Sequence, residues 1–435
     1  MTGTDLPGGD APDSARHDAR AQVEEVARSS YGRLVAYLAA GTGDIAGAED
    51  ALADAFVAAL ATWPTRGVPD RPDSWLLTAA RRNLVDAARR RDTARRAAPQ
   101  VARLLEQGGD DRRADGQGSV IPDVRLQLMF ACTHPAIDVA VRSPLMLQTV
   151  LGLDAARIGA LFLVEPTTMG QRLVRAKAKI KRAGVPFRIP GDGELPGRVG
   201  AVLDAVYAAY TAGWDELGAG PSGAVDLPVA AGAPAGLTDL AGEAVRLGRL
   251  VVRLLPDDPE AAGLLALLLH SHARRDARRA ADGTFVPLQR QDTSRWSSAL
   301  MAEAEQHLAR ATTAGRLGPY QLLAAIQSVH ALRAVTGTTD THAVAQLYEG
   351  LVHLTPTVGV LVARAAAVLA DEGATAALRY LDELPMDRVR SYQPYWVTRA
   401  AVLDAMAAPG GSAAREQAVR LTADAAVRAH LASGG

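Results

Sequence analysis

Helix-length segments separated by short breaks recur along this chain and constrain its fold more than any other feature. In the last hundred residues they cover 341–354, 357–371, 374–383, 394–407 and 412–422. Alanine, leucine, arginine and glycine dominate the composition, whereas aromatic residues make up only 4% of it. Alanine, leucine and arginine favour helices, and the aromatic residues enriched in strands are scarce here. The sequence therefore predicts an all-α protein.

The helix-length segments beyond residue 240 come at the spacing of helix pairs. Such pairs are typical of a helical-repeat array, in which each helical hairpin buries one face on the next. An ordinary helical bundle is the alternative, because no complete repeat consensus is present.

The 435 residues leave room for two to four domains. The stretch 93–122 contains paired arginines, paired aspartates and several glycines, a composition typical of a flexible linker. Composition and turn residues divide the chain into five expected parts. These are a disordered tail (1–22), a helical module (23–92), the linker (93–122), a second helical module (123–190) and a helical C-terminal region (191–435).

Several classes of protein are disfavoured by the sequence. A single cysteine, Cys132, cannot build a disulfide framework, and no apolar run near the start indicates a signal peptide. The longest apolar stretch, 263–269, is too short to span a membrane. We therefore expect a cytoplasmic protein. No spacing of histidine, cysteine or carboxylate residues indicates a catalytic site, a metal site or a cofactor site.

Charge is distributed unevenly around a net value of −1. Residues 123–190 carry 10 basic and 4 acidic residues, whereas residues 191–435 carry 21 basic and 26 acidic ones. All the lysines, Lys177, Lys179 and Lys181, lie in the first of these segments. One basic module in a near-neutral chain indicates a nucleic-acid contact of limited area.

Residues 154–182 have the pattern of a helix, a tight turn and a second helix. Asp154 is a suitable N-cap for the first helix, and Pro166 suits the first turn of the second. A basic second helix in this arrangement can place side chains in the major groove of DNA. The alternative is an amphipathic helix whose polar face is only solvated.

The helical wheel of the second helix separates two faces. Met169, Leu173, Ala176 and Ile180 form the face expected to be buried. The candidate DNA-reading side chains are Thr167, Thr168, Gln171, Arg172, Arg175 and Lys179. Lys177 and Lys181 fall toward the buried flank instead.

Residues 71–91 predict another amphipathic helix. Leu76, Ala80, Leu84 and Ala87 make its apolar face. The other side carries Trp75, Arg82, Asp86 and Arg89. A tryptophan on the same face as arginines suits single-stranded or melting DNA, because bases stack on aromatic rings while arginines hold phosphates. The alternative, favoured when this helix is taken alone, is that Trp75 begins the hydrophobic core.

Residues 48–63 predict a third helix of this kind. Its expected buried stripe consists of Leu52, Phe56, Leu60 and Trp63. Asp50 and Asp54 point away from the stripe and indicate an acidic face for a protein partner, or plain solvation.

Three sequence stretches in this order resemble the extracytoplasmic-function sigma factors of the sigma-70 family of RNA polymerase subunits. The stretches are AEDALADAF, SWLLTAARRNLVDAARRR and LGLDAARIGALFLVEPTTMGQRLVRAKAKIK. Further stretches, among them LQLMFACTHPAID and LGPYQLLAAIQSVHA, resemble the subgroup with a long C-terminal extension similar to tetratricopeptide (TPR) repeats. The resemblance covers roughly residues 25–430.

The resemblance implies a non-enzymatic protein that binds core RNA polymerase, at its clamp and flap regions, and promoter DNA. Sigma region 2 would place Asp50, Asp54 and Phe56 on the polymerase. The −10 element would meet Trp75, Arg81, Arg82, Asn83, Arg89 and Arg90. Sigma region 4 would read the −35 element through the recognition helix, and the C-terminal extension is a candidate contact for a protein regulator.

Two interpretations from other classes remain open. A helix-turn-helix regulator with a repeat-type sensor domain would bind an operator without being a polymerase subunit, but it leaves 48–91 unexplained. A helical enzyme would use His270, His272 and Arg274 with their neighbours Arg275 and Asp276, although no cofactor motif supports it.

Overall fold

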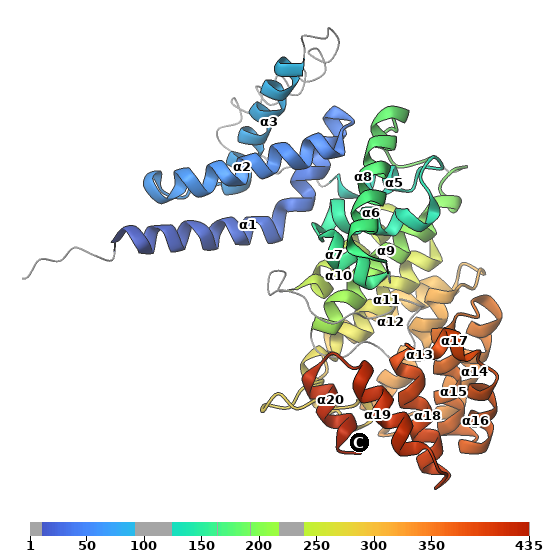
Figure 1. Cartoon of the computed structure of the whole chain (residues 1–435). Helices are drawn as coiled ribbons and strands as arrows, with labels where there is room; N and C mark the ends of the chain where they lie inside the picture. Colours follow the sequence, from blue (N-terminus) through green and yellow to red (C-terminus); the bar gives the residue numbers. More distant parts are fainter. Residues whose placement is uncertain (1–10, 92–123, 163, 192, 217–238, 435) are drawn as a thin grey trace, which may run out of the picture. The chain divides into compact units, whose positions relative to one another are not determined.

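The computed structural model describes residues 11–91, 124–162, 164–191, 193–216 and 239–434, and Figure 1 shows them as helices joined by short connections. Within these ranges the only β-type pairing is an isolated bridge between Arg279 and Phe285. The prediction of an all-α fold is therefore confirmed. The expected linker, 93–122, lies outside the described residues.

The chain divides into two compact units. The first comprises Met1–Ile158 and Pro166–Val202, and the second Gly159–Glu165 and Leu203–Gly435. The helices from the N-terminus to the start of the second unit are α1 (Ala11–Thr42), α2 (Ile45–Arg66), α3 (Pro72–Arg91), α5 (Arg125–Cys132), α6 (Val139–Leu151), α7 (Ala155–Leu161), α8 (Pro166–Ala183) and α9 (Pro196–Glu216).

The longer segment of the second unit begins within α9 and continues through further helices. They are α10 (Leu240–Leu254), α11 (Pro259–Ala273), α12 (Ser298–Thr312), α13 (Pro319–Thr336), α14 (Thr341–Leu354), α15 (Val358–Asp371), α16 (Ala374–Asp382), α17 (Met386–Val389), α18 (Gln393–Ala405), α19 (Gly411–Leu421) and α20 (Ala425–Ala432). Short 3₁₀ turns η2 (Arg275–Ala277), η3 (Leu288–Arg290) and η4 (Thr293–Arg295) connect α11 to α12.

In the first unit, α1 packs against α2 and α3 around a core of leucines. Leu34, Leu38, Leu52 and Leu76 are fully buried there. The break between α1 and α2 is set by Asp44, whose side chain caps α2 by accepting a hydrogen bond from the backbone N–H of Gly47. A single side-chain cap thus fixes where the second helix starts.

The start of α1 differs from the sequence prediction. Residues 11–22 were expected to belong to a disordered tail, but they are helical. Alanine and arginine make up five of the eight residues 15–22 and favour helix, whereas the glycines lie before residue 11. The prediction therefore placed the boundary too far along the chain.

Helices α5 and α6 also pack against α1 within the first unit. The backbones approach each other closely at Gly32, where an added Cβ atom would lie 1.8 Å from the carbonyl oxygen of Val150. No side chain fits at that distance, so the α1–α6 packing requires glycine at this position. Helix α8 contacts both α2 and α6 in the same unit.

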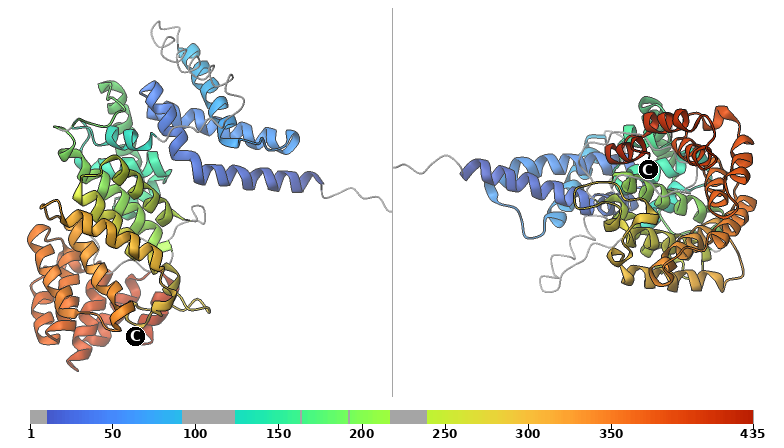
Figure 2. Two further views of the ribbon diagram at one scale, coloured as in Figure 1. Left: turned by 180° about the vertical axis from the view of Figure 1, so that it is seen from behind. Right: turned by 90° about the horizontal axis from the view of Figure 1, so that it is seen from below.

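In the second unit α11 lies at the centre of a group formed with α10, α12 and α13. Gly263 permits close packing there, because a Cβ atom would lie 2.8 Å from the backbone nitrogen of Gln321. Successive helices from α13 onward follow a curved path (Figure 2). Each packs on its neighbour in the order expected for stacked hairpins, α13 on α14, α14 on α15, α15 on α16 and α18 on α19.

The five helix-length segments predicted at 341–422 correspond to α14, α15, α16, α18 and α19, with ends that agree to within two residues. Val362, Ala377, Leu381, Tyr395 and Val402 form a common buried cluster across α15, α16 and α18. Among the described helices none is long and apolar enough to cross a membrane.

Candidate functional site

Helix α8 separates two faces as the sequence predicts. Met169, Leu173 and Ile180 are each 1% exposed, so the expected apolar stripe is buried. Asp154 accepts a hydrogen bond from the backbone N–H of Arg157 at 2.7 Å, as expected of the N-cap of α7. Pro166 is the first residue of α8.

The candidate DNA-reading residues lie on the opposite side of α8. Thr167, Thr168, Gln171, Arg175 and Lys179 are exposed, and Arg172 is half-buried. The guanidinium Nε of Arg175 donates to the carbonyl oxygen of Gln171, one turn earlier, at 3.2 Å. These side chains present hydroxyl, amide and cationic groups on one surface, a set able to meet base edges and phosphates.

The two remaining lysines of α8 face α2. Lys177 Nζ lies 2.6 Å from Glu49 Oε2, and Lys181 Nζ lies 2.5 Å from Asp44 Oδ2. The Lys177–Glu49 pair is shielded from water, with side-chain exposures of only 11% and 15%. Burial raises the pKa of Glu49, and the hydrogen bond from Lys177 offsets this only in part.

Helix α2 carries the predicted acidic face, and its buried stripe differs from the prediction. Asp50 and Asp54 are exposed as expected, Phe56 is half-buried, and Leu60 is 46% exposed instead of buried. Spacings of four residues advance 40° per step around a helix, so Leu60 has turned 80° away from Leu52. Alanines occupy the buried positions in between. The buried residues of α2 are Ile45, Ala48, Ala51, Leu52, Ala55, Ala59 and Trp63.

Apolar side chains therefore accompany the carboxylates on the outer side of α2. Val57 is 66% exposed, and it shares a face with Asp50 and Asp54 at spacings of four and three residues. Leu60 lies at the edge of the same face. We call Asp50, Asp54, Val57 and Leu60 the outer face of α2. Apolar and acidic side chains side by side on one helix are suited to contact with a protein.

Helix α3 uses part of its predicted DNA-facing set to hold the unit together. Trp75 packs edge-to-face against Trp63, with ring centroids 5.6 Å apart. Arg81 donates to the hydroxyl of Tyr37 at 2.9 Å, and the amide of Asn83 donates to the carbonyl oxygen of Ala51 at 3.1 Å. The contact between Trp75 and the buried Trp63 therefore supports the alternative in which Trp75 belongs to the hydrophobic core.

The remaining members of the α3 set are three arginines, Arg82, Arg89 and Arg90. Arg82 is exposed. Arg89 and Arg90 lie on α3, but their side chains are outside the described part of the structure.

Of the residues considered for an enzyme, His270 and Arg274 are buried in helix packing, whereas Asp276 is exposed. His270 is 1% exposed and its Nε2 lies 3.3 Å from Glu305 Oε1. Arg274 is 6% exposed, and its guanidinium contacts the side chain of Gln327 and the carbonyl oxygen of His270. Burial raises the pKa of the Cys132 thiol to about 12, so that thiol is not a reactive nucleophile. No group of three histidine, cysteine or carboxylate residues among the described residues could hold a metal ion.

Sequence reasoning missed the acidic partners of α8. Glu49 and Asp44 lie 128 and 137 positions before the lysines that they bind. The only signal in the sequence was that Lys177 and Lys181 fall on the buried flank of their helix. A buried lysine requires an acidic partner, but the helical pattern does not identify which residue supplies it.

Comparison with known proteins identifies two regions of the chain. The family model described as Sigma-70 region 2 matches residues 26–94, which include the second half of α1 and the whole of α2 and α3. A second model, described as a family of unknown function (DUF6596), matches residues 198–312. No solved structure matches the chain.

One relative covers most of the length of the chain. Uncharacterized protein R00370 of Rhizobium meliloti (strain 1021) is 34% identical over 389 residues, which is 88% of each chain. The chain therefore belongs to the same protein family as this relative, and the match of residues 26–94 to Sigma-70 region 2 supports a place in the sigma-70 family.

Proposed function

We propose that this protein is a sigma factor of the extracytoplasmic-function type, which binds core RNA polymerase and directs it to specific promoters. The observation that carries the proposal is the outer face of α2, inside Sigma-70 region 2. There Asp50 and Asp54 make no ion pair with any described residue, and Val57 beside them is 66% exposed. An exposed face of this composition is suited to bind a protein, and we assign it to the clamp of the polymerase.

The promoter contacts are assigned to two helices. Arg82 on α3 is exposed and is assigned to the proposed −10 surface together with Arg89 and Arg90. Trp75, Arg81 and Asn83 contact neighbouring helices and would support this surface. The exposed side of α8, from Thr167 to Lys179, is the proposed −35 surface, and α7 with α8 would form the helix-turn-helix of sigma region 4. The flap of the polymerase is the proposed partner of this module.

The small basic surface limits what the free protein can do. Residues 123–190 exceed neutrality by only six charges (10 basic against 4 acidic), and the whole chain has a net charge of −1. Affinity for DNA grows with the number of phosphates neutralised, so the free protein should bind promoter DNA weakly. Promoter binding should appear only with core enzyme. Tight, sequence-specific binding of the free protein to a −35 fragment would contradict the proposal.

The second unit, which resembles a TPR-like extension, is proposed to regulate transcription by docking on a protein. Residues 191–435, most of which belong to this unit, carry 26 acidic residues against 21 basic ones, and this excess disfavours direct contact with DNA. The described helices from α13 to α19 stack in succession and so offer an extended surface for a partner.

Transcription with core polymerase tests the proposal. Run-off assays on promoter-containing templates, with RNA 5′ ends mapped, should show defined start sites only when the protein is present. The Asp50→Arg, Asp54→Arg double variant should lose core binding and all starts. The Thr168→Ala, Gln171→Ala variant should still bind core but lose specific starts. A protein that binds specific DNA equally well with or without core, and whose Asp50 and Asp54 are dispensable, would instead be the alternative regulator with a sensor domain.

A further inference from the structure

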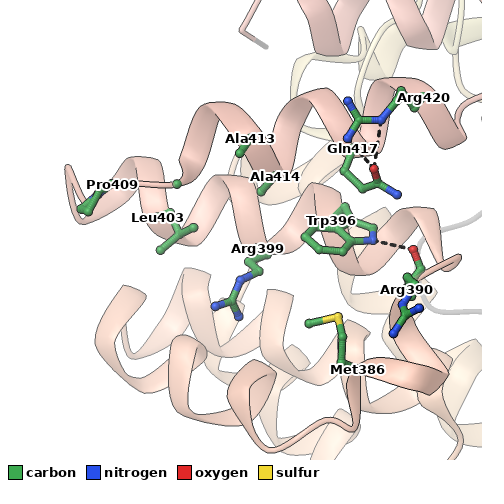
Figure 3. Close-up of a pocket in the computed structure, with 11 residues that line it drawn as sticks. Met386, Arg390, Trp396, Arg399, Leu403, Pro409, Ala413, Ala414, Gln417 and Arg420 are labelled. Carbon is green, nitrogen blue, oxygen red and sulfur yellow. Dashed lines mark hydrogen bonds between the residues drawn. The ribbon is translucent and has the colours of Figure 1, made fainter.

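A groove at the C-terminal end of the second unit has the chemistry of a peptide-binding site. It lies among α17, α18 and α19, and encloses about 610 Å³ (Figure 3). Its apolar part is formed by Met386, Trp396 and Leu403, together with the alanines at 413 and 414 of α19. The rest of its lining is largely cationic.

Three arginines line this groove, and no carboxylate does. They are Arg390, Arg399 and Arg420. Arg399 is held by Asp382, which accepts a hydrogen bond from its Nη1 at 2.7 Å. Arg420 donates only to the neutral amide oxygen of Gln417, at 3.0 and 2.6 Å. Neither Arg390 nor Arg420 forms an ion pair with any described residue, so two full positive charges remain uncompensated at the rim.

The aromatic ring between these arginines is fixed in place. The indole Nε1 of Trp396 donates to the backbone carbonyl oxygen of Arg390 at 3.0 Å. Its ring also packs edge-to-face on Tyr395, with centroids 5.2 Å apart. Trp396 is half-buried, so its ring remains available to an apolar side chain entering from outside. Anchoring before binding reduces the entropy that a ligand has to overcome.

We propose that this groove binds an acidic peptide segment of a partner protein, with an apolar side chain against Trp396 and Leu403 and flanking carboxylates on Arg390 and Arg420. Guanidinium groups match the planar geometry of carboxylates and form charge-assisted hydrogen bonds with them. The inference rests on the proposed function only for its regulatory consequence, because peptide binding requires neither polymerase nor promoter.

Charge complementarity selects this occupant over a nucleic acid. Residues 386–420 carry five arginines and three acidic residues, within a C-terminal region that is acidic overall. Nucleic acids need an extended basic track, because their affinity comes from many phosphates at once. A short acidic peptide needs only the charges within about 10 Å, which is the screening distance at moderate salt.

Selection of a displayed library of random 12-residue peptides on the full-length protein tests the proposal. Enriched peptides should combine two or more acidic residues with a large apolar one. Binding of the best of them, synthesised with a fluorescent label, should weaken at least tenfold in the Arg390→Glu, Arg420→Glu double variant. The matched control is Arg379→Glu, Arg388→Glu, which makes the same charge change at exposed arginines of the same unit outside the groove and should leave affinity unchanged.

Several results would overturn the assignment. These are the absence of any enriched acidic class, equal loss of affinity in both double variants, and displacement of the peptide by a 20-nucleotide single strand of DNA at lower concentration than by unlabelled peptide. Far-ultraviolet circular dichroism of both variants separates loss of binding from loss of folding. Failure of peptide binding would leave the sigma proposal standing, and failure of transcription would leave the peptide result standing.

Discussion

The ion pair between Lys177 and Glu49 gives the sharpest test of how the first unit is held together. Replacing Lys177 with methionine keeps most of the unbranched side chain and removes its charge. Glu49 Oε2 then loses its partner at 2.6 Å, while Glu49 Oε1 already has no hydrogen-bond partner among the described residues. The substitution therefore leaves a carboxylate that is only 15% exposed without any compensating cation within bonding distance.

The expected cost follows from burial. Removing one partner of a fully buried pair costs about 3–5 kcal/mol, and the residual exposure of both groups reduces this to roughly 2–3 kcal/mol. Replacing Glu49 with leucine as well should recover most of the loss, because a buried ion pair exchanged for apolar groups is often close to neutral in stability. The pair should thus show a coupling of about 2 kcal/mol in a double-mutant cycle.

Hydrogen–deuterium exchange of the full-length chain measures the loss of stability around this ion pair. A local measurement is necessary because a chain of two units need not unfold in one step. A loss of roughly 2–3 kcal/mol corresponds to about 30- to 150-fold faster exchange in α8 and in the first turns of α2. Lys179→Met, on the exposed side of the same helix, is the matched control and should leave exchange unchanged. Equal exchange in Lys177→Met and the parent, or strictly additive effects in the cycle, would refute the reasoning.

The pH dependence of this variant has a defined sign. Burial holds the pKa of Glu49 above its ordinary value in the folded protein. An acid whose pKa is raised by folding destabilises the folded state at high pH, and the penalty is relieved as the pH falls toward that pKa. The exchange defect of Lys177→Met should therefore shrink on acidification, and a defect that grows instead would contradict the origin given to it.

Three further predictions concern other parts of the molecule. Gly32→Ala should separate α1 from α6 and cost more than about 2 kcal/mol, seen as a lower melting temperature, whereas Gly200→Ala, where an added Cβ meets nothing within 4 Å, should be neutral or slightly stabilising. Burial and the charges of Arg274 and Arg333 lower the pKa of His330 to about 4. The neutral His330 therefore favours the folded state above pH 6.5, and this contribution is lost as the pH falls toward 4. When the pH is lowered from 7.5 to 5.5, the free energy of unfolding measured in urea titrations should fall by roughly 1 kcal/mol less in His330→Gln than in the parent. Deleting residues after 195 should change transcription in vitro, and unchanged activity with every template and partner would contradict the proposed regulatory role of the second unit.

The sequence predicts local structure well where one periodicity dominates. The buried stripe of α8 and the helices between residues 341 and 422 follow directly from the 3.6-residue repeat and from breaks at glycine and proline. Prediction was less accurate on α2, because its alanines Ala55 and Ala59 compete with Leu60 for the core side. Small residues permit close packing of helices, so the alanine side of α2 is buried. A helical wheel that ranks leucine above alanine instead predicts that the side carrying Leu60 is buried.

The candidate surfaces depend on contacts that no periodicity encodes. Arg81 and Asn83 resemble a DNA-reading set in sequence, yet one donates to Tyr37 and the other to the backbone of Ala51. A basic or amide side chain on an exposed-looking face can equally tie two helices together, and only the tertiary fold distinguishes these roles. The same holds for Lys177, whose partner Glu49 lies in a different helix far away in sequence.

The lysines of α8 thus divide between two tasks that the sequence shows only as one basic cluster. Lys179 stands on the exposed side with Gln171 and Arg175, where its charge is available to phosphate. Lys177 and Lys181 face Glu49 and Asp44, where their charges are already compensated. Because compensated charges release no counterions on binding DNA, the salt dependence of promoter binding should change with Lys179→Ala by about one unit of slope. The same substitution at Lys177 should act through the packing of α8 on α2, and should alter affinity without altering that slope.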